Sequence, residues 1–202
     1  MMQLIGMLDS PYVRRVAICL KLLGIAFEHH AISVFSGFDR FKAINPVVKA
    51  PTLVLADDQI LMDSSLILEY ASSIAPTGKI LLPTQGAERL RALQLNGLAL
   101  AACEKTVQIV YEQQLRPQEK QHQPWLDRIQ NQLLAAYAEL EKQLPQAAMP
   151  GWMGSAEVSV AVAWSFTQLM LPGQISAEQH PALAAFSANA EKHPAFVSTP
   201  QV

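Results

Sequence analysis

From the N-terminus to Ala75, short apolar runs alternate with segments whose apolar residues recur at helical spacing. A helical segment separates the first two runs, so the strands that they predict should lie parallel. Asp57-Asp58 separates the last two runs and suits a tight hairpin. The pattern predicts a four-stranded mixed sheet covered by helices. The strands are expected over Gln3–Met7, Phe27–Val34, Thr52–Ala56 and Gln59–Met62, and the helices over Pro11–Leu23, Phe38–Ile44 and Ser64–Ile74.

After residue 77 the strand-like runs stop, and only helical periodicity follows. Residues 78–86 contain Pro83 and Gly86, which is typical of a linker. We therefore predict an α+β protein of two domains, with an α/β domain over residues 1–77 and an all-helical domain over residues 87–202. The helices expected in the second domain are Ala87–Gln114, Trp125–Leu144, Val158–Leu171 and Pro181–Ala190.

The composition indicates a globular protein without a nucleic-acid or membrane partner. Half of the 202 residues are hydrophobic and 16% are charged, which excludes a disordered chain. The net charge of −2 leaves no basic excess to bind phosphates. Val158–Ala177 has no charged residue, but Pro172 and Gly173 interrupt it, so we expect a buried helix there instead of a membrane span. Met1–Leu8 lacks Lys and Arg, so we expect no secretory signal and a cytoplasmic protein.

The cysteines and histidines predict neither a disulfide nor a metal site. Cys19 and Cys103 lie far apart in apolar stretches, which is typical of reduced core thiols in a cytosolic protein. His29 and His30 are adjacent in an alternating run, so a structural role in a strand is expected for both. No Cys-x-x-Cys motif and no Cys/His cluster with the spacing of metal ligands occurs.

Ser10-Pro11 directly follows the first predicted strand and begins the first predicted helix. Proline is favoured at the first helical position, which makes Ser10 the N-cap. A hydroxyl group, free N–H groups and the positive end of a helix suit an anion, and a helix N-terminus lowers the pKa of a thiol from its usual ~8.5. Ser10 therefore either only caps its helix or also holds an external thiolate.

Two further strand ends offer contacts for a small extended peptide. Lys49-Ala50-Pro51 opens the third strand, and a cis bond before Pro51 would leave the main chain of Ala50 open for pairing, although trans is the commoner form. Asp63-Ser64 begins the next helix. There Ser64 could hold a carboxylate and Asp63 an ammonium group, or both residues could simply cap the helix. With the N-terminus of the first helix, these strand ends predict a site for a zwitterionic peptide that carries a thiol.

Three segments carry these residues: Ser10-Pro11-Tyr12-Val13-Arg14-Arg15, then Asn45-Pro46-Val47-Val48-Lys49-Ala50-Pro51-Thr52-Leu53, then Asp63-Ser64-Ser65-Leu66-Ile67-Leu68-Glu69-Tyr70. In order and spacing they resemble the glutathione S-transferase family, and above all the small bacterial transferases with a serine at the first helix. The helical second half resembles the family as well, so the resemblance covers nearly the whole chain.

The resemblance implies a thioredoxin-like N-terminal domain followed by an all-helical C-terminal domain. It implies a homodimer that takes glutathione as co-substrate. Ser10 would donate a hydrogen bond to the glutathione thiolate. Ala50 would pair with the cysteinyl main chain ahead of a cis Pro51.

The resemblance also assigns the two ends of glutathione and the second substrate. Asp63 and Ser64 would hold the γ-glutamyl end, and Lys49 would lie near the glycine carboxylate. The second substrate, a small hydrophobic electrophile, would bind against the helical domain, where Tyr111 and Arg116 are the candidate contacts.

The sequence departs from the family pattern at particular positions. Asp63 stands where the family more often has Glu and is shorter by one methylene. Gly154 replaces the hydroxyl residue of a helix N-capping box whose carboxylate remains as Glu157. Ser10 stands where a redox member would place a cysteine, which disfavours chemistry through a protein thiol. We predict a glutathione transferase for alkyl or aryl groups; a glutathione-dependent disulfide or peroxide reductase and a non-catalytic binding or regulatory protein remain open.

Overall fold

In the computed structural model, which describes residues 1–147 and 153–201, four strands form one mixed sheet in the order β2-β1-β3-β4. Strands β1 (Met2–Ile5) and β2 (Phe27–His30) run parallel, because α1 (Pro11–Leu23) connects them. Strand β3 (Thr52–Val54) pairs antiparallel with β1 and with β4 (Ile60–Met62). The predicted four-stranded mixed sheet is confirmed.

The strands are shorter than the alternating pattern predicts. The register between β1 and β2 ends at the pair Ile5 and His30, so the alternation up to Val34 has no partner strand to pair with. The N–H of Ile32 turns back instead and donates to the carbonyl oxygen of His30 at 2.9 Å. Strand length is therefore set by the partner strand and not by the run of alternating residues.

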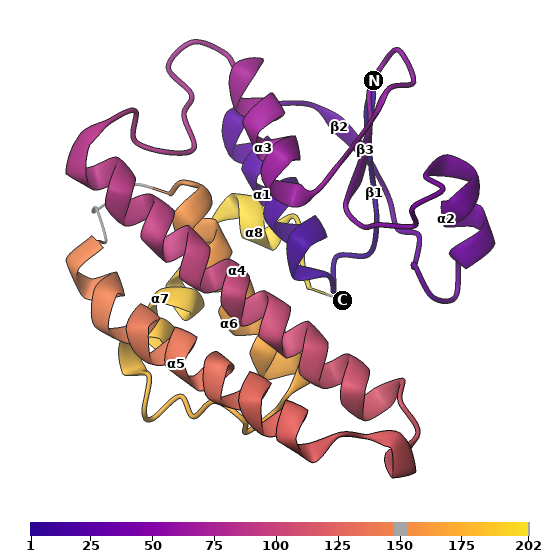
Figure 1. Cartoon of the computed structure of the whole chain (residues 1–202). Helices are drawn as coiled ribbons and strands as arrows, with labels where there is room; N and C mark the ends of the chain where they lie inside the picture. The colour runs from indigo at the N-terminus through magenta and orange to yellow at the C-terminus, as the bar shows by residue number, and fades with distance from the viewer. Residues whose placement is uncertain (148–152, 202) are drawn as a thin grey trace. The chain divides into compact units, whose positions relative to one another are not determined.

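Helices cover both faces of this sheet, as Figure 1 shows. Helices α1 and α3 (Ser64–Ser73) lie on one face, and α2 (Phe38–Ile44) lies on the other. Phe41 of α2 is fully buried and packs with Ile5 and Ile32. Burying such side chains supplies most of the free energy that holds a sheet and its helices together.

The boundaries of α1 follow the predicted signals. Ser10 is in an extended conformation before the helix, and Pro11 is its first residue. Gly24 ends the helix with a φ of 73°, a left-handed conformation that favours glycine, and its N–H donates to the carbonyl oxygens of Leu20 and Lys21. The helix therefore begins and ends where the sequence predicts.

The chain divides into two compact units. The first contains Met1–Leu81, Met153–Val158 and the stretch that begins at Lys192; the second contains the described part of residues 82–152 and Ser159–Glu191. The C-terminal stretch, which the sequence predicted as part of the helical domain, thus belongs to the unit that contains the sheet.

A short helix that the sequence pattern did not predict, α8 (Pro194–Val197), explains this return of the chain. Arg14 of α1 is 2% exposed, and its guanidinium carbon lies 5.5 Å from the ring centroid of Phe196. Its Nε donates a hydrogen bond of 3.0 Å to the carbonyl oxygen of Thr199. Phe196 is fully buried, so α8 completes the core beside α1.

The second unit is helical and contains α4 (Gly86–Gln114), a short 3-10 turn over Gln118–Lys120, α5 (Gln123–Ala147), most of α6 (Ser155–Met170) and α7 (Pro181–Ala190). Buried hydrogen bonds of the Tyr137 and Thr167 side chains connect three of these helices. None of the described helices has the length and apolarity needed to span a membrane.

The start of α6 keeps half of the predicted capping box. The N–H of Gly154 donates to Oε2 of Glu157 at 3.0 Å, as the retained carboxylate predicted. Burial raises the pKa of this carboxyl group. The carboxylate therefore fixes the first turn of α6 without the hydroxyl group that Gly154 lacks.

We expect the folded protein to resist thiol reagents. Cys19 is fully buried, Cys103 is 3% exposed, and burial raises the pKa of the Cys19 thiol to about 12. Because only an accessible thiolate reacts, a disulfide reagent such as dithionitrobenzoate should release no chromophore from the native protein. It should release two equivalents after denaturation in urea. Rapid labelling of one thiol in the native protein would show that one of these sites opens.

Candidate functional site

Ser10 lies at the N-terminus of α1 and caps it. Its Oγ accepts the N–H of Val13 at 3.5 Å, which is long for such a bond. Among the described residues, no group receives the hydroxyl proton of Ser10. The hydroxyl group can therefore cap the helix and still donate to a ligand, so the two predicted roles of Ser10 are compatible.

The bond between Ala50 and Pro51 is cis, as the family resemblance implied and against the general preference for trans. In the part of the chain that the structure describes, the N–H and C=O groups of Ala50 have no hydrogen-bond partner. Thr52 anchors this loop, because its hydroxyl donates to the carbonyl oxygen of Lys49 at 2.7 Å and accepts from Asn45 at 2.8 Å. The main chain of Ala50 is thus open to an extended peptide, and Lys49 beside it is exposed.

Asp63 and Ser64 form the start of α3. Asp63 has a φ of 69° and caps the helix through Oδ1, which accepts the N–H of Ser65 at 2.9 Å. Ser64 is 2% exposed, and its Oγ accepts a hydrogen bond of 2.9 Å from Nη1 of Arg15. The capping role is confirmed for Asp63, and its Oδ2 accepts no hydrogen bond from the described residues.

Gly6 lies between Val13 of α1 and the loop that contains Ala50. It follows β1 with a φ of 138°, and a Cβ atom there would lie 2.6 Å from Cγ2 of Val13 and 3.1 Å from Cβ of Ala50. Nε2 of His29 donates to the Gly6 carbonyl oxygen at 2.7 Å, and the Gly6 N–H donates to His30 at 3.0 Å. The expected structural role of His29 is therefore confirmed, because its hydrogen bond fixes Gly6 between Val13 and Ala50.

Arg15 is the residue of this region that sequence reasoning missed. It lies 2% exposed among the apolar positions of α1 and contacts Ser64, which is 49 residues away. The sequence offers one signal that Arg15 is buried: it lies one helical turn before Cys19, on the side of the helix predicted to face the core. A charged residue at an apolar position needs a polar partner, and the start of α3 supplies it.

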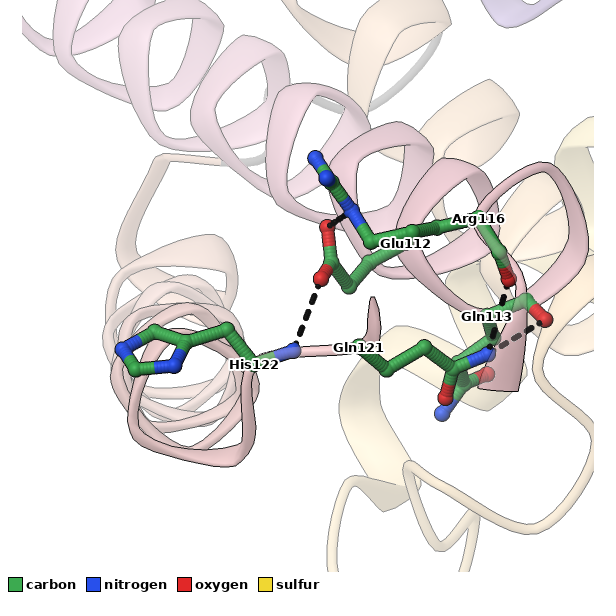
Figure 2. A network of polar contacts seen from close by, with 5 residues as sticks. All are labelled: Glu112, Gln113, Arg116, Gln121 and His122. Carbon is green, nitrogen blue, oxygen red and sulfur yellow. Dashed lines mark hydrogen bonds and ion pairs between the residues drawn. The ribbon is translucent and has the colours of Figure 1, made fainter. Parts of the chain in front are cut away.

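The helical unit contains Tyr111 and Arg116, the candidate contacts of the second substrate. Tyr111 is 44% exposed near the end of α4, and burial of the other part of its ring raises the pKa of its hydroxyl group. Figure 2 shows Arg116 beside Glu112, with its Nε 2.8 Å from Oε2 of that carboxylate. Oε1 of Glu112 accepts the N–H of His122 at 3.0 Å and so ties the end of α4 to the start of α5. Arg116 keeps its terminal nitrogens for other contacts, because only its Nε donates to Glu112.

We expect Glu112→Gln to lower the melting temperature at pH 7. The N–H of His122 and the neighbouring Arg116 hold the pKa of Glu112 below its usual 4.5. A lowered folded-state pKa contributes stability above pH 4.5, and this contribution disappears as the pH falls through the folded-state pKa. The melting temperatures of wild type and variant, followed by circular dichroism, should therefore converge in acid. Glu139→Gln is the matched control, because its pair with Lys142 is exposed and 3.7 Å long, and it should change little.

Among residues 1–147 and 153–201, no three His, Cys, Asp or Glu side chains gather into a group that could hold a metal ion. The polar groups at the candidate site are instead the hydroxyl, main-chain and carboxylate groups described above.

Comparison with known proteins supports the resemblance to glutathione S-transferases that the segments around Ser10, Ala50 and Ser64 suggest. The family model described as the N-terminal domain of glutathione S-transferase matches residues 4–79. A glutathione transferase family member from Pseudomonas fluorescens Pf-5, crystallised with bound glutathione, is 28% identical, with a TM-score of 0.85 over 100% of both chains. Residues 4–79 thus match the N-terminal domain of glutathione S-transferases, and the whole chain is similar in fold and sequence to a glutathione transferase family member.

A second structure and a curated protein are also similar to this chain. A structure of the Pseudomonas fluorescens protein with bound S-(propanoic acid)-glutathione is 29% identical, with a TM-score of 0.84 over 98% of both chains. The uncharacterised GST-like protein YibF of Escherichia coli K12 is 33% identical over 100 residues, which is 48% of each chain. The matched region thus spans about half the length of this curated relative. The two domain types found in the family, a thioredoxin-like sheet domain and an all-helical domain, are those of the fold described above.

Proposed function

We propose that this protein is a glutathione transferase that activates the thiol of glutathione for attack on a small hydrophobic electrophile. The observation that carries the proposal is the hydroxyl of Ser10 at the N-terminus of α1, whose proton no described residue receives. Family members with similar chains contain bound glutathione or a glutathione conjugate, which supports glutathione as the co-substrate.

Thiol activation follows from the position of Ser10. A thiolate placed there would accept the hydroxyl proton in a hydrogen bond and lie at the positive end of α1. Each unit by which the pKa of the bound thiol falls corresponds to about 1.4 kcal/mol of preference for the anion. The enzyme would thus raise the concentration of the nucleophile near neutral pH and hold it in place.

Main-chain pairing would fix the rest of the peptide. The open N–H and C=O groups of Ala50 offer two hydrogen bonds to the cysteinyl main chain of glutathione. At the start of α3, Ser64 would bind the γ-glutamyl carboxylate, and Asp63 would bind the ammonium group through its free carboxylate oxygen. The exposed Lys49 would lie near the glycine carboxylate.

The reaction with an aromatic chloride balances without a further reactant. The glutathione sulfur forms a bond to the ring carbon, the carbon–chlorine bond breaks, and chloride leaves. The thiol proton passes to solvent before the attack. Tyr111 and Arg116 remain the predicted contacts of the electrophile. The chemical groups that these two side chains would bind depend on the identity of the electrophile.

We also propose a cytoplasmic homodimer, as the family resemblance implies. Both units carry apolar side chains that the described chain leaves exposed. Leu66 of α3 is 52% exposed and Leu90 of α4 is 59% exposed, although isolated apolar residues are normal on a protein surface. Light scattering coupled to size exclusion should give a mass of about twice 22.2 kDa. A monomer at micromolar concentration would contradict this part of the proposal.

The first experiment is a titration of the protein with reduced glutathione by calorimetry, with ultraviolet spectra recorded in parallel near neutral pH. Saturable binding with a thiolate band supports activation by the site. Conjugation with 1-chloro-2,4-dinitrobenzene then tests the transferase step. Absence of binding at millimolar glutathione would overturn the proposal and favour a regulatory protein.

The burial of both Cys19 and Cys103 disfavours a redox activity through a protein thiol. Reduction of disulfides by bound glutathione itself would use the same activated thiol. A mixed glutathione disulfide offered as substrate separates this activity from conjugation.

A further inference from the structure

Arg15 holds two neighbouring hydroxyl groups at the start of α3. Its Nη1 lies 2.9 Å from Oγ of Ser64 and 3.3 Å from Oγ of Ser65. A guanidinium nitrogen of this kind has two protons and no acceptor, so it can donate one hydrogen bond to each hydroxyl oxygen. Both oxygens therefore act as acceptors toward Arg15, and each hydroxyl group keeps its own proton to donate elsewhere.

The surroundings favour an anion as the receiver of those protons. Asp63 already accepts the N–H of Ser65, whereas the N–H groups of Ser64 and Leu66 have no hydrogen-bond partner among the described residues. Ser65 is exposed, and Arg15 places its charge directly behind the two hydroxyl groups while remaining 2% exposed itself. A buried cation that orients exposed donors strengthens them toward an anion, because solvent screens it little.

We propose that Arg15 is a positioning residue for the γ-glutamyl carboxylate of glutathione and that Ser65 donates a direct hydrogen bond to this carboxylate. The inference rests on the proposed function and extends it. Arg15 does not itself contact the ligand: it fixes the hydroxyl oxygens of Ser64 and Ser65 as acceptors, so that their protons point to the carboxylate. Ser65 becomes a glutathione contact beside Ser64.

The test compares two ligands by calorimetry: glutathione, and its analogue in which the γ-glutamyl carboxylate is an uncharged amide. Arg15→Gln should raise the Kd for glutathione about tenfold, because hydroxyl groups that are no longer oriented by Arg15 form weaker hydrogen bonds to the charged carboxylate, and it should change the Kd for the amide far less. Ser65→Ala should show the same selectivity without altering the core. Ser73→Ala is the matched control, because this exposed hydroxyl at the other end of α3 donates to Tyr70 and should leave both Kd values unchanged.

Each outcome decides a separate question. Wild-type protein that binds neither ligand overturns the proposed function and this inference with it. If wild type binds glutathione but Arg15→Gln weakens both ligands equally, or neither, Arg15 supports only the fold and the inference is wrong. If Arg15→Gln does not fold, Ser65→Ala carries the test, and the proposal requires this variant of an exposed residue to lose affinity for glutathione selectively.

Discussion

Ser10→Ala should lower kcat/KM for glutathione and an aromatic chloride by about 100-fold, the effect typical of removing one hydrogen-bond donor to a developing or bound anion. The variant loses the only side-chain group at the N-cap of α1 that can donate to the thiolate. The pKa of bound glutathione, read from the thiolate absorbance against pH, should rise toward that of the free thiol.

The change should have a small effect on stability. The capping bond from Val13 to Ser10 is 3.5 Å long, so its loss should cost less than the ~1 kcal/mol typical of a serine N-cap. Ser10→Thr is the matched control, because threonine keeps both the hydroxyl group and the ability to cap, and it should recover part of the activity. A Ser10→Ala variant with wild-type turnover and an unchanged thiolate band would remove Ser10 from the mechanism.

Gly6→Ala should reduce the free energy of unfolding by about 3 kcal/mol or more, because a strained backbone and an overpacked contact add together. The φ of 138° disfavours any side chain, and the new Cβ would lie 2.6 Å from Val13. The contact with Ala50, at 3.1 Å, should displace the loop proposed to pair with glutathione. Urea denaturation and a glutathione titration measure the two effects.

Alanine substitutions at two other glycines distinguish the cost of backbone strain from the cost of steric overlap. Gly24→Ala introduces a side chain at a φ of 73° with no atom within 4 Å, so it should cost only about 1 kcal/mol. Gly97→Ala, inside α4 and also in open space, should stabilise the protein by up to about 1 kcal/mol. If Gly6→Ala costs no more than Gly24→Ala, the close approach of Val13 and Ala50 is not what requires glycine at position 6.

The sequence by itself determined the order of the strands and main helices and the caps that begin the helices at the site. Helix α1 begins and ends where Ser10-Pro11 and Gly24 predict, because caps act within one turn of the chain. The parallel pairing of β1 and β2 followed from the helix between them. The cysteines were predicted to be buried, and they are, because both lie within apolar stretches.

The tertiary structure alone decided the contacts between distant segments. Arg14 reaches Thr199 across 185 residues, which returns the C-terminal stretch to the sheet unit, and Arg15 reaches Ser64 across 49 residues. The cis bond before Pro51 and the close approach of Gly6 to Ala50 likewise concern the packing of loops. Periodicity and capping signals describe neighbours along the chain, whereas a buried guanidinium takes the polar partner that packing brings to it. The sequence therefore predicted Ser10 as a donor, and only the fold revealed what holds Ser64 and Ser65.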